Sequence, residues 1–183
     1  HTFFAKESIF NQTVPGYFYR QKPDGSFSNA SGCGNEIASE RKMVREYIID
    51  SLKYWVEEFH VDGFRFDLMG IYDLETMKTI RSEMDKLDDG LFLYGEGWIA
   101  DQSPMNEQLR AIKKNIAQLP GIGCFNDDFR DALKGNHGSK KNKGFISGLD
   151  LREEAVKFGV VGAVDHPQIV YNFVETSERA WAT

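Results

Sequence analysis

The sequence predicts an α/β protein built on a parallel β-sheet. Two short apolar segments, residues 61–67 and 91–97, are typical of buried strands, and an amphipathic helical segment connects them. A strand, a helix and a second strand in close succession indicate parallel pairing. The composition, 41% hydrophobic and 27% charged over 183 residues, agrees with a globular domain.

The stretch before the first strand predicts a long ordered loop followed by a helix. Residues 1–34 are rich in Gly, Ser, Asn, Pro and aromatic residues, with turns expected at 15–16 and 23–25. A loop of this length in a compact domain is usually functional. The helix is expected over about 38–59, with Ser39 as its N-cap. Its apolar face comprises Val44, Ile48, Leu52, Trp55, Val56 and Phe59.

The helix between the two strands has clear start and stop signals. Asp73 is its expected N-cap, and the turn-forming residues 88–90 end it. Its apolar face comprises Leu74, Met77, Ile80, Met84 and Leu87.

The pattern weakens after the second strand. It predicts a helix over 105–118, a strand over 122–125, and a helical turn over 127–133. A solvated loop is expected over 134–148, and no element is assigned to 149–183, where Val160-Val161 indicates a core contact.

Charge and composition argue against several classes of partner. The chain has 22 basic and 28 acidic residues, and this net charge of −6 disfavours nucleic acid and anionic membrane surfaces. Its apolar runs fall short of the ~18 residues of a membrane span. The two cysteines, Cys33 and Cys124, form no metal-binding or redox motif, and whether they pair stays open. No secretory signal precedes the loop, so cytoplasmic, periplasmic and secreted locations all stay open.

Both predicted strands end on a carboxylate, Asp67 and Glu96. The carboxyl ends of parallel strands meet at one edge of the sheet, where parallel α/β barrels form their sites. Neighbouring strands lie about 4.8 Å apart, so these carboxyl groups can approach the ~5–5.5 Å separation of retaining glycosidases. In those enzymes one carboxylate attacks the sugar, while the other protonates the leaving oxygen and then activates water.

The neighbours of the two acids favour the same roles. Arg65 lies two residues before Asp67 on the same side of the strand, and its charge suits an ionised nucleophile. Glu96 lies between Gly95 and Gly97 beside aromatic residues, a partly dry setting that suits a proton donor. From the pattern alone, such acids also cap helices, pair with cations or bind metal ions, and these alternatives stay open.

The segments around the two acids resemble known signatures. HVDGFRFDLMG (60–70) is similar to the fourth-strand signature of the alpha-amylase superfamily, glycoside hydrolase family thirteen, and LYGEGW (93–98) to its fifth-strand signature. Residues 32–70 and 125–135 resemble type I pullulanases in particular. The resemblance implies that Asp67 is the nucleophile and Glu96 the general acid/base.

The resemblance also implies substrate-binding residues. Arg65 belongs to the fourth-strand signature, His1 is expected to contact the sugar beside the cleaved bond, and Trp98 to stack near the next sugar. Asn35 lies on a loop expected to touch substrate, with a helix-entry cap as the alternative. The family's third acid, an Asp beside a His after the seventh strand, has no counterpart in this sequence. Asp165-His166-Pro167 has the reverse order and is interpreted as a turn.

The implied fold is part of a (β/α)₈ TIM barrel, about strands three to six, incomplete at both ends, with residues 1–183 as one partial catalytic domain. The parent enzyme is expected to cleave α-1,6-glucosidic bonds in pullulan and branched α-glucans with retention. No cofactor is implied, and no metal-ligand cluster is visible. The segment alone is expected to be inactive and to self-associate through its exposed barrel edges. The alternatives are another α-glucan-acting enzyme of the superfamily and a non-catalytic α-glucan-binding protein.

Overall fold

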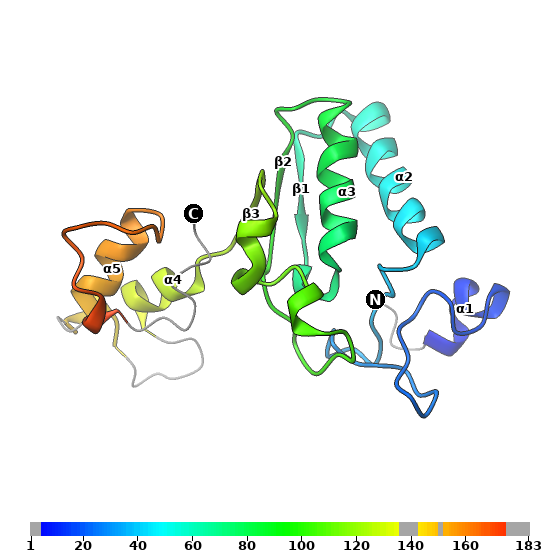
Figure 1. Ribbon diagram of the computed structural model, residues 1–183, viewed down its shortest axis with the longest axis horizontal. Coiled ribbons are helices and arrows are strands. Elements are labelled where there is room, and N and C mark those ends of the chain that lie inside the picture. The colour runs from blue at the N-terminus through cyan, green and yellow to red at the C-terminus, as the bar shows by residue number, and fades with distance from the viewer. Residues whose placement is uncertain (1–4, 136–142, 150–151, 175–183) are drawn as a thin grey trace. The chain divides into compact units, whose positions relative to one another are not determined.

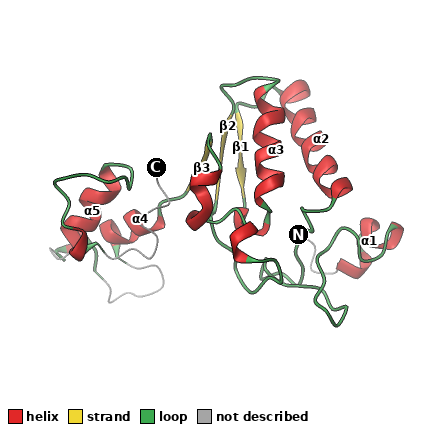
Figure 2. Ribbon diagram, viewed as in Figure 1, coloured by secondary structure: helices red, strands yellow, loops and turns green. Residues whose placement is uncertain are grey.

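The computed structural model describes residues 5–135, 143–149 and 152–174. The chain divides into two compact units, residues 1–124 and 125–183, and each is described by itself. The first unit contains the sheet, and the described part of the second contains only helices and turns (Figures 1 and 2). The predicted α/β class is confirmed.

The sheet consists of three parallel strands in the order β1-β2-β3. They are β1 (Gly63–Phe66), β2 (Phe92–Gly95) and β3 (Ile122–Cys124). The register pairs Phe66 with Gly95 and Gly95 with Cys124, so all three strands end at the same level. The three predicted strands are thus confirmed, each slightly shorter than expected.

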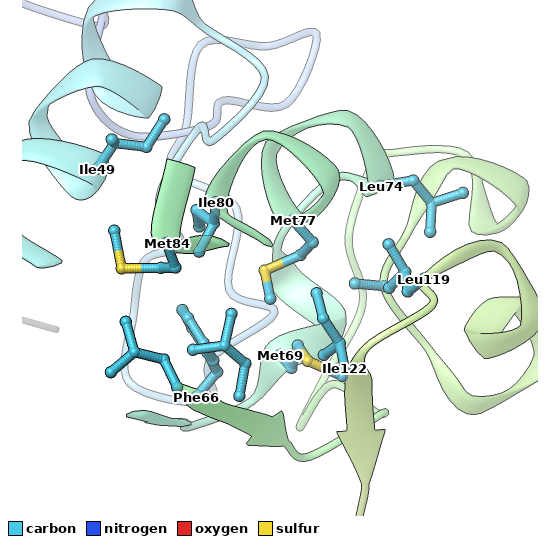
Figure 3. Close-up of a cluster of buried hydrophobic side chains, with 12 residues drawn as sticks. Ile49, Phe66, Met69, Leu74, Met77, Ile80, Met84, Leu119 and Ile122 are labelled. Carbon is cyan, nitrogen blue, oxygen red and sulfur yellow. The ribbon is translucent and has the colours of Figure 1, made fainter. Parts of the chain in front are cut away.

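Two helices pack on one face of the sheet. They are α2 (Lys42–Phe59) and α3 (Leu74–Asp85), which lie side by side in Figure 1. Alternation along the strands turns one set of side chains toward these helices and the other set away. The core between sheet and helices is shown in Figure 3 and consists of Ile49, Phe66, Met69, Leu74, Met77, Ile80, Met84, Leu91, Leu93, Ala111, Leu119 and Ile122.

The start of α3 agrees with the sequence prediction. The carboxylate of Asp73 accepts a hydrogen bond from the Thr76 amide at 2.9 Å, which makes Asp73 the N-cap. Burial by itself would raise the pKa of Asp73, but hydrogen bonds from Thr76 and Ser39 lower it below its ordinary value. Asp73 is therefore held as a carboxylate in the core.

The start of α2 differs from the prediction, and Ser39 is not its N-cap. The helix begins at Lys42 with Arg41 as N-cap. The Ser39 hydroxyl donates instead to the Asp73 carboxylate at 2.7 Å. This tertiary hydrogen bond replaces the helix cap that the local sequence predicted. The predicted apolar face is also partly wrong, because Trp55 is 45% and Phe59 56% exposed.

The expected helix over 105–118 is wrong. The segment forms two 3₁₀ helices, η3 (Glu107–Leu109) and η4 (Lys113–Gln118). Between them, Arg110 forms an isolated antiparallel bridge with Asp73, and the Ala111 amide donates to the Tyr72 carbonyl. These extended contacts with the start of α3 interrupt the helical ladder.

The long N-terminal loop contains short helices that the sequence did not reveal. They are η1 (Ala5–Glu7) and α1 (Ile9–Thr13). The expected turns are present, and Gly16 and Gly25 occupy them with φ of 72° and 80°. Isolated bridges join Tyr19 to Ile37 and Gln21 to Phe27, so the loop folds back on itself.

The second unit is built from short helices. The elements in its described part are α4 (Asp127–Lys134), η5 (Phe145–Ser147), α5 (Glu153–Val160) and η7 (Tyr171–Phe173). The predicted helical turn is confirmed as α4. Val160 is 70% exposed, so its interpretation as core is wrong. The His166 carbonyl accepts from the Ile169 amide at 3.2 Å, which agrees with the turn expected there.

Candidate active site

The two predicted acids lie next to each other at the carboxyl edge of the sheet. Asp67 directly follows β1 and Glu96 directly follows β2. The Glu96 amide donates to the Phe66 carbonyl at 3.1 Å, which continues the parallel register to the end of β1. The sheet therefore fixes the backbone of both acids relative to each other.

Arg65 joins the two carboxylates. One guanidinium nitrogen pairs with Asp67 Oδ1, and the other lies 2.9 Å from Glu96 Oε1. The hydrogen bond to Asp67 and the charges of Glu96 and Asp67 raise the pKa of Arg65 above its ordinary value. A planar guanidinium suits this bridge because its N–H groups diverge in a fixed fork.

The second oxygen of Glu96 is held by the backbone. Glu96 Oε2 accepts a hydrogen bond from the Leu68 amide at 2.8 Å. Leu68 adopts a left-handed conformation with φ of 44°, which for a residue other than glycine costs on the order of 1–2 kcal/mol. This strained turn directs the amide next to Asp67 toward Glu96, so the two acids are linked through backbone as well as through Arg65.

Glycines flank Glu96 because the chain passes close to its neighbours there. A Cβ on Gly95 would lie 2.6 Å from the Phe66 carbonyl oxygen. A Cβ on Gly97 would lie 2.7 Å from Cys124 Sγ. Side chains at these positions would push the Glu96 segment away from β1 and β3.

The two acids differ in their exposure. The side chain of Glu96 is 19% exposed and that of Asp67 is 61% exposed. The Glu96 carboxylate is thus mostly enclosed with both oxygens bonded, and the Asp67 carboxylate is open to a ligand from solvent. This asymmetry fits a pair in which one group transfers protons and the other reacts directly with substrate.

The other predicted site residues lie in different surroundings. Trp98, two residues after Glu96, is half-buried, and its carbonyl accepts from the Gly70 amide at 3.2 Å. Asn35 is fully buried and is not a helix cap. It lines a cavity of about 280 Å³ with Phe10, Phe18, Tyr19, Ile37, Tyr47 and Tyr72. His1 lies outside the described residues.

The cavity around Asn35 is adjacent to the acid site on one side. Burial first, and then the negative charge of Asp67, raise the pKa of the Tyr72 hydroxyl. Tyr72 also lines the cavity, and its ring packs edge-on against Phe66 with centroids 5.8 Å apart. Tyr72 therefore connects this cavity to Phe66, the last residue of β1.

Sequence reasoning missed the amide of Leu68. A backbone donor has no side-chain signature, and the αL conformation of a leucine is unusual, so no sequence signal indicated it. Within the described ranges, no group of three or more His, Cys, Asp or Glu side chains is arranged to hold a metal ion. Nor is any helix of these ranges long and apolar enough to span a bilayer.

The chain is similar to pullulanases in sequence. It is 42% identical over 188 residues to the pullulanase of Bacillus subtilis (strain 168), an alignment that covers 98% of this chain and 26% of the relative. It is 39% identical over 165 residues to the chloroplastic pullulanase 1 of Arabidopsis thaliana, which covers 84% of this chain and 17% of that relative. No protein-family model matches the chain.

Solved structures give the same result. Pullulanase from Paenibacillus barengoltzii, in complex with maltohexaose and α-cyclodextrin, matches with a TM-score of 0.84 and 49% identity over 87% of this chain and 24% of that chain. Type I pullulanase from Bacillus subtilis, complexed with maltose, matches with a TM-score of 0.85 and 44% identity over 92% of this chain and 24% of that chain.

These similarities define the class of protein: the chain is homologous to a segment of the starch-debranching glycoside hydrolases. The relatives and structures reported above are pullulanases, of type I in the Bacillus subtilis structure, so the predicted resemblance is confirmed. The chain spans about a quarter of the Bacillus subtilis pullulanase, 26% of its sequence and 24% of its solved structure.

Proposed function

We propose that this chain carries the nucleophile and the acid/base of a retaining glycoside hydrolase. The longer enzyme that contains it would cleave α-1,6-glucosidic bonds in pullulan and branched α-glucans. The observation that supports this most strongly is the pairing of Asp67 and Glu96 at adjacent strand ends, with Arg65 bonded to both. The similarity to pullulanases points to the substrate class.

The chemistry follows from the two carboxylates. Asp67 attacks the anomeric carbon while Glu96 gives its proton to the leaving glycosidic oxygen, and a glycosyl ester forms on Asp67. Glu96 then takes a proton from water, which attacks the ester and releases the sugar with retained configuration. The exposure of Asp67 suits direct attack, and the enclosure of Glu96 suits proton transfer.

The strands belong, in this proposal, to a (β/α)₈ barrel. β1, β2 and β3 would be its fourth, fifth and sixth strands, and residues 1–183 one partial catalytic domain. The parallel order and the helices on one face support this assignment. His1, Asn35 and Trp98 would then contact sugar units near the cleaved bond, with Trp98 stacking on the sugar of the leaving side.

We propose an α-glucan as the binding partner of this chain, and we propose no binding to nucleic acid or membranes. The related structures hold maltohexaose with α-cyclodextrin, maltotriose or maltose. The net charge of −6 supports a neutral partner rather than a polyanion.

The test uses the longer enzyme with pullulan as substrate. Wild type is expected to release maltotriose, and Asp67→Asn and Glu96→Gln are each expected to lower kcat by at least about a thousandfold. Asp62→Asn is the matched control, because Asp62 is exposed just before the opposite end of β1. Its kcat should equal that of wild type.

Two outcomes would contradict the proposal. Substantial turnover by either acid variant would remove the assigned roles. Tight binding of maltooligosaccharides by wild type without any release of product would favour a non-catalytic binding protein.

A further inference from the structure

A buried ion pair lies in the loop before α2. Glu36 is 0% and Arg20 5% exposed, and their side chains meet with Arg20 Nη1 2.6 Å from Glu36 Oε1. Arg20 Nη2 also pairs with Glu40 at 2.7 Å. Burial of Arg20 acts to lower its pKa, but its bonds and charge pairing with Glu40 and Glu36 outweigh burial and raise it. Arg20 is therefore held as a cation in this buried position.

Glu36 uses both carboxylate oxygens to join separate segments. Oε2 accepts from the Ala30 amide at 2.9 Å. Oε1 accepts from Arg20 and also from the Ser103 hydroxyl at 2.8 Å. The residue thus links the N-terminal loop to the segment that follows Glu96 and Trp98.

The link continues through the backbone of Ala30. The Ala30 carbonyl accepts from the Ala100 amide at 2.8 Å and from the Asp101 amide at 3.3 Å. Ala30 thus donates its amide to Glu36 and accepts with its carbonyl from the loop after Glu96. Ala30 and Glu36 therefore both hold residues 100–103, the latter through Ser103, and Asn29 adds a hydrogen bond to Asp101 at 2.9 Å.

Arg20, which pairs with Glu36, also contacts the segment after Asp67. Arg20 Nη2 donates to the Ile71 carbonyl at 3.4 Å. The preceding residue, Gly70, donates its amide to the carbonyls of Glu96 and Trp98 at 3.1 and 3.2 Å. The Arg20–Glu36 pair consequently lies between the two chain segments that carry the acids, bonded to both.

The charge of Glu36 suits positioning better than it suits stability. A buried ion pair gains little over apolar side chains of the same volume, because desolvation offsets the attraction. The hydrogen bonds of Glu36, however, define one geometry. Its carboxylate accepts from three separate donors, and an amide group, which has only one acceptor oxygen, cannot accept from all three in the same arrangement.

We propose that Glu36 is a positioning residue that sets the place of the Glu96–Trp98 segment relative to Asp67. This inference rests on the proposed function, because it assigns Glu96 the acid/base role. Glu36 acts through Ala30 and Ser103 and makes no contact with the sugar.

The decisive variant is Glu36→Gln in the longer enzyme. It keeps the shape but turns one acceptor into a donor that faces the Ala30 amide, Arg20 or Ser103. We expect kcat for pullulan to fall roughly 10- to 100-fold, the effect of a displacement of about 1 Å at a reacting group, with a much smaller change in KM. Glu36→Asp, which keeps the charge, should recover part of kcat.

Glu83→Gln is the matched control. Glu83 pairs with Lys53 and Lys86 on the outer side of α2 and α3, so its loss also removes carboxylate bonds between segments. If Glu36 acted only on stability, the two Gln variants would both keep the kcat of wild type per folded molecule. Equal kcat in Glu36→Gln and wild type would overturn the proposal.

Amide hydrogen exchange measures the connection between Glu36 and residues 100–101 without an activity assay. The Ala100 and Asp101 amides should exchange faster in Glu36→Gln, while the Thr76 amide, bonded to Asp73, should not change. If wild type proves inactive on pullulan, the proposed function fails but this measurement still tests the link. Unchanged exchange at both amides would overturn the inference while leaving the function intact.

Ser103→Ala covers the case in which Glu36→Gln does not fold. It removes the hydroxyl that donates to Glu36 and accepts from the Met105 amide and from Arg20. A smaller loss of kcat, together with faster exchange at residues 100–101, is expected. Wild-type values for both would contradict the positioning role.

Discussion

Arg65 gives the two acids a common counter-charge. It lies 2.9 Å from Glu96 and is also paired with Asp67. Two carboxylates at neighbouring strand ends repel each other, and a guanidinium between them offsets this repulsion while fixing their orientation. The geometry of the pair thus depends on a fork of N–H donors, and a single point charge cannot replace it.

Arg65→Lys in the longer enzyme tests this dependence. The ammonium group can pair with one carboxylate at a time, so we expect kcat to fall at least about a hundredfold, as for loss of a directed donor in other active sites. Arg130→Lys is the control, because Arg130 pairs with Asp131 at similar exposure. A kcat within a few-fold of wild type in Arg65→Lys would show that charge alone suffices.

The acids and Arg65 could be predicted from sequence because strand alternation and parallel pairing fix where they lie. The Leu68 amide could not, because its direction depends on a left-handed backbone at that residue. The burial of Asn35 was also unpredictable, since it results from packing of the N-terminal loop against α2 and Tyr72.

At the scale of elements, Asp73 connects α3 to the segment before α2. Its carboxylate binds the Thr76 amide as a cap, the Ser39 hydroxyl at 2.7 Å and Arg45 at 3.2 Å. The Ser39 hydroxyl also accepts from the Asp73 amide at 2.9 Å. One side chain therefore begins α3 and fixes the approach to α2.

Asp73→Ala is expected to lower the free energy of unfolding by about 1–3 kcal/mol at neutral pH, through loss of the cap and of buried hydrogen bonds. Urea unfolding followed by circular dichroism measures it. Asp50→Asn, at an exposed position of α2, is the control and should change little. A loss no larger than that of the control would show that the contacts around Asp73 contribute nothing to stability.

The lowered pKa of Asp73 predicts a pH dependence for Asp73→Asn. A lowered pKa means that the folded state favours the carboxylate, so its contribution is full above the ordinary value of 3.8 and is lost as pH falls through the lower folded value. The stability difference between wild type and Asp73→Asn should therefore shrink below about pH 4. A difference that stays constant down to pH 2 would contradict this assignment.

Most elements of the first unit could be predicted because their hydrophobic periodicity matches their packing, as in α3. The failures occur where distant groups compete with local signals. Ser39 donates a hydrogen bond to Asp73 instead of capping α2. The backbone of Arg110 forms a β-bridge with that of Asp73 instead of continuing a helix. Val160 is apolar but lies on the exposed side of α5, and periodicity in an eight-residue helix gives too few repeats to show this.

At the scale of the whole molecule, the described sheet has two open edges. β1 and β3 each pair with β2 only. The face that carries Arg65 also presents Phe92, which is 63% exposed and lies tilted against the Tyr94 ring. Unpaired edges beside exposed aromatic side chains favour pairing with another chain.

The isolated 183-residue chain is therefore expected to self-associate and to release no maltotriose from pullulan, whereas the proposed longer enzyme is expected to release it. Sedimentation velocity at several concentrations measures the first property, and product analysis the second. A monomer that cleaves pullulan would contradict both expectations, and active oligomers would contradict the second.

The close approach of the chain on both sides of Glu96 determines where the specificity of such an enzyme can be engineered. Gly95 and Gly97 have no room for a β-carbon, so a mutant library randomised there consists mainly of displaced or unfolded loops. Trp98 is half-buried and already carries a large side chain, so in the proposed function its replacements alter the surface offered to a sugar. Directed evolution of substrate preference in this loop should begin at Trp98 and leave both glycines untouched.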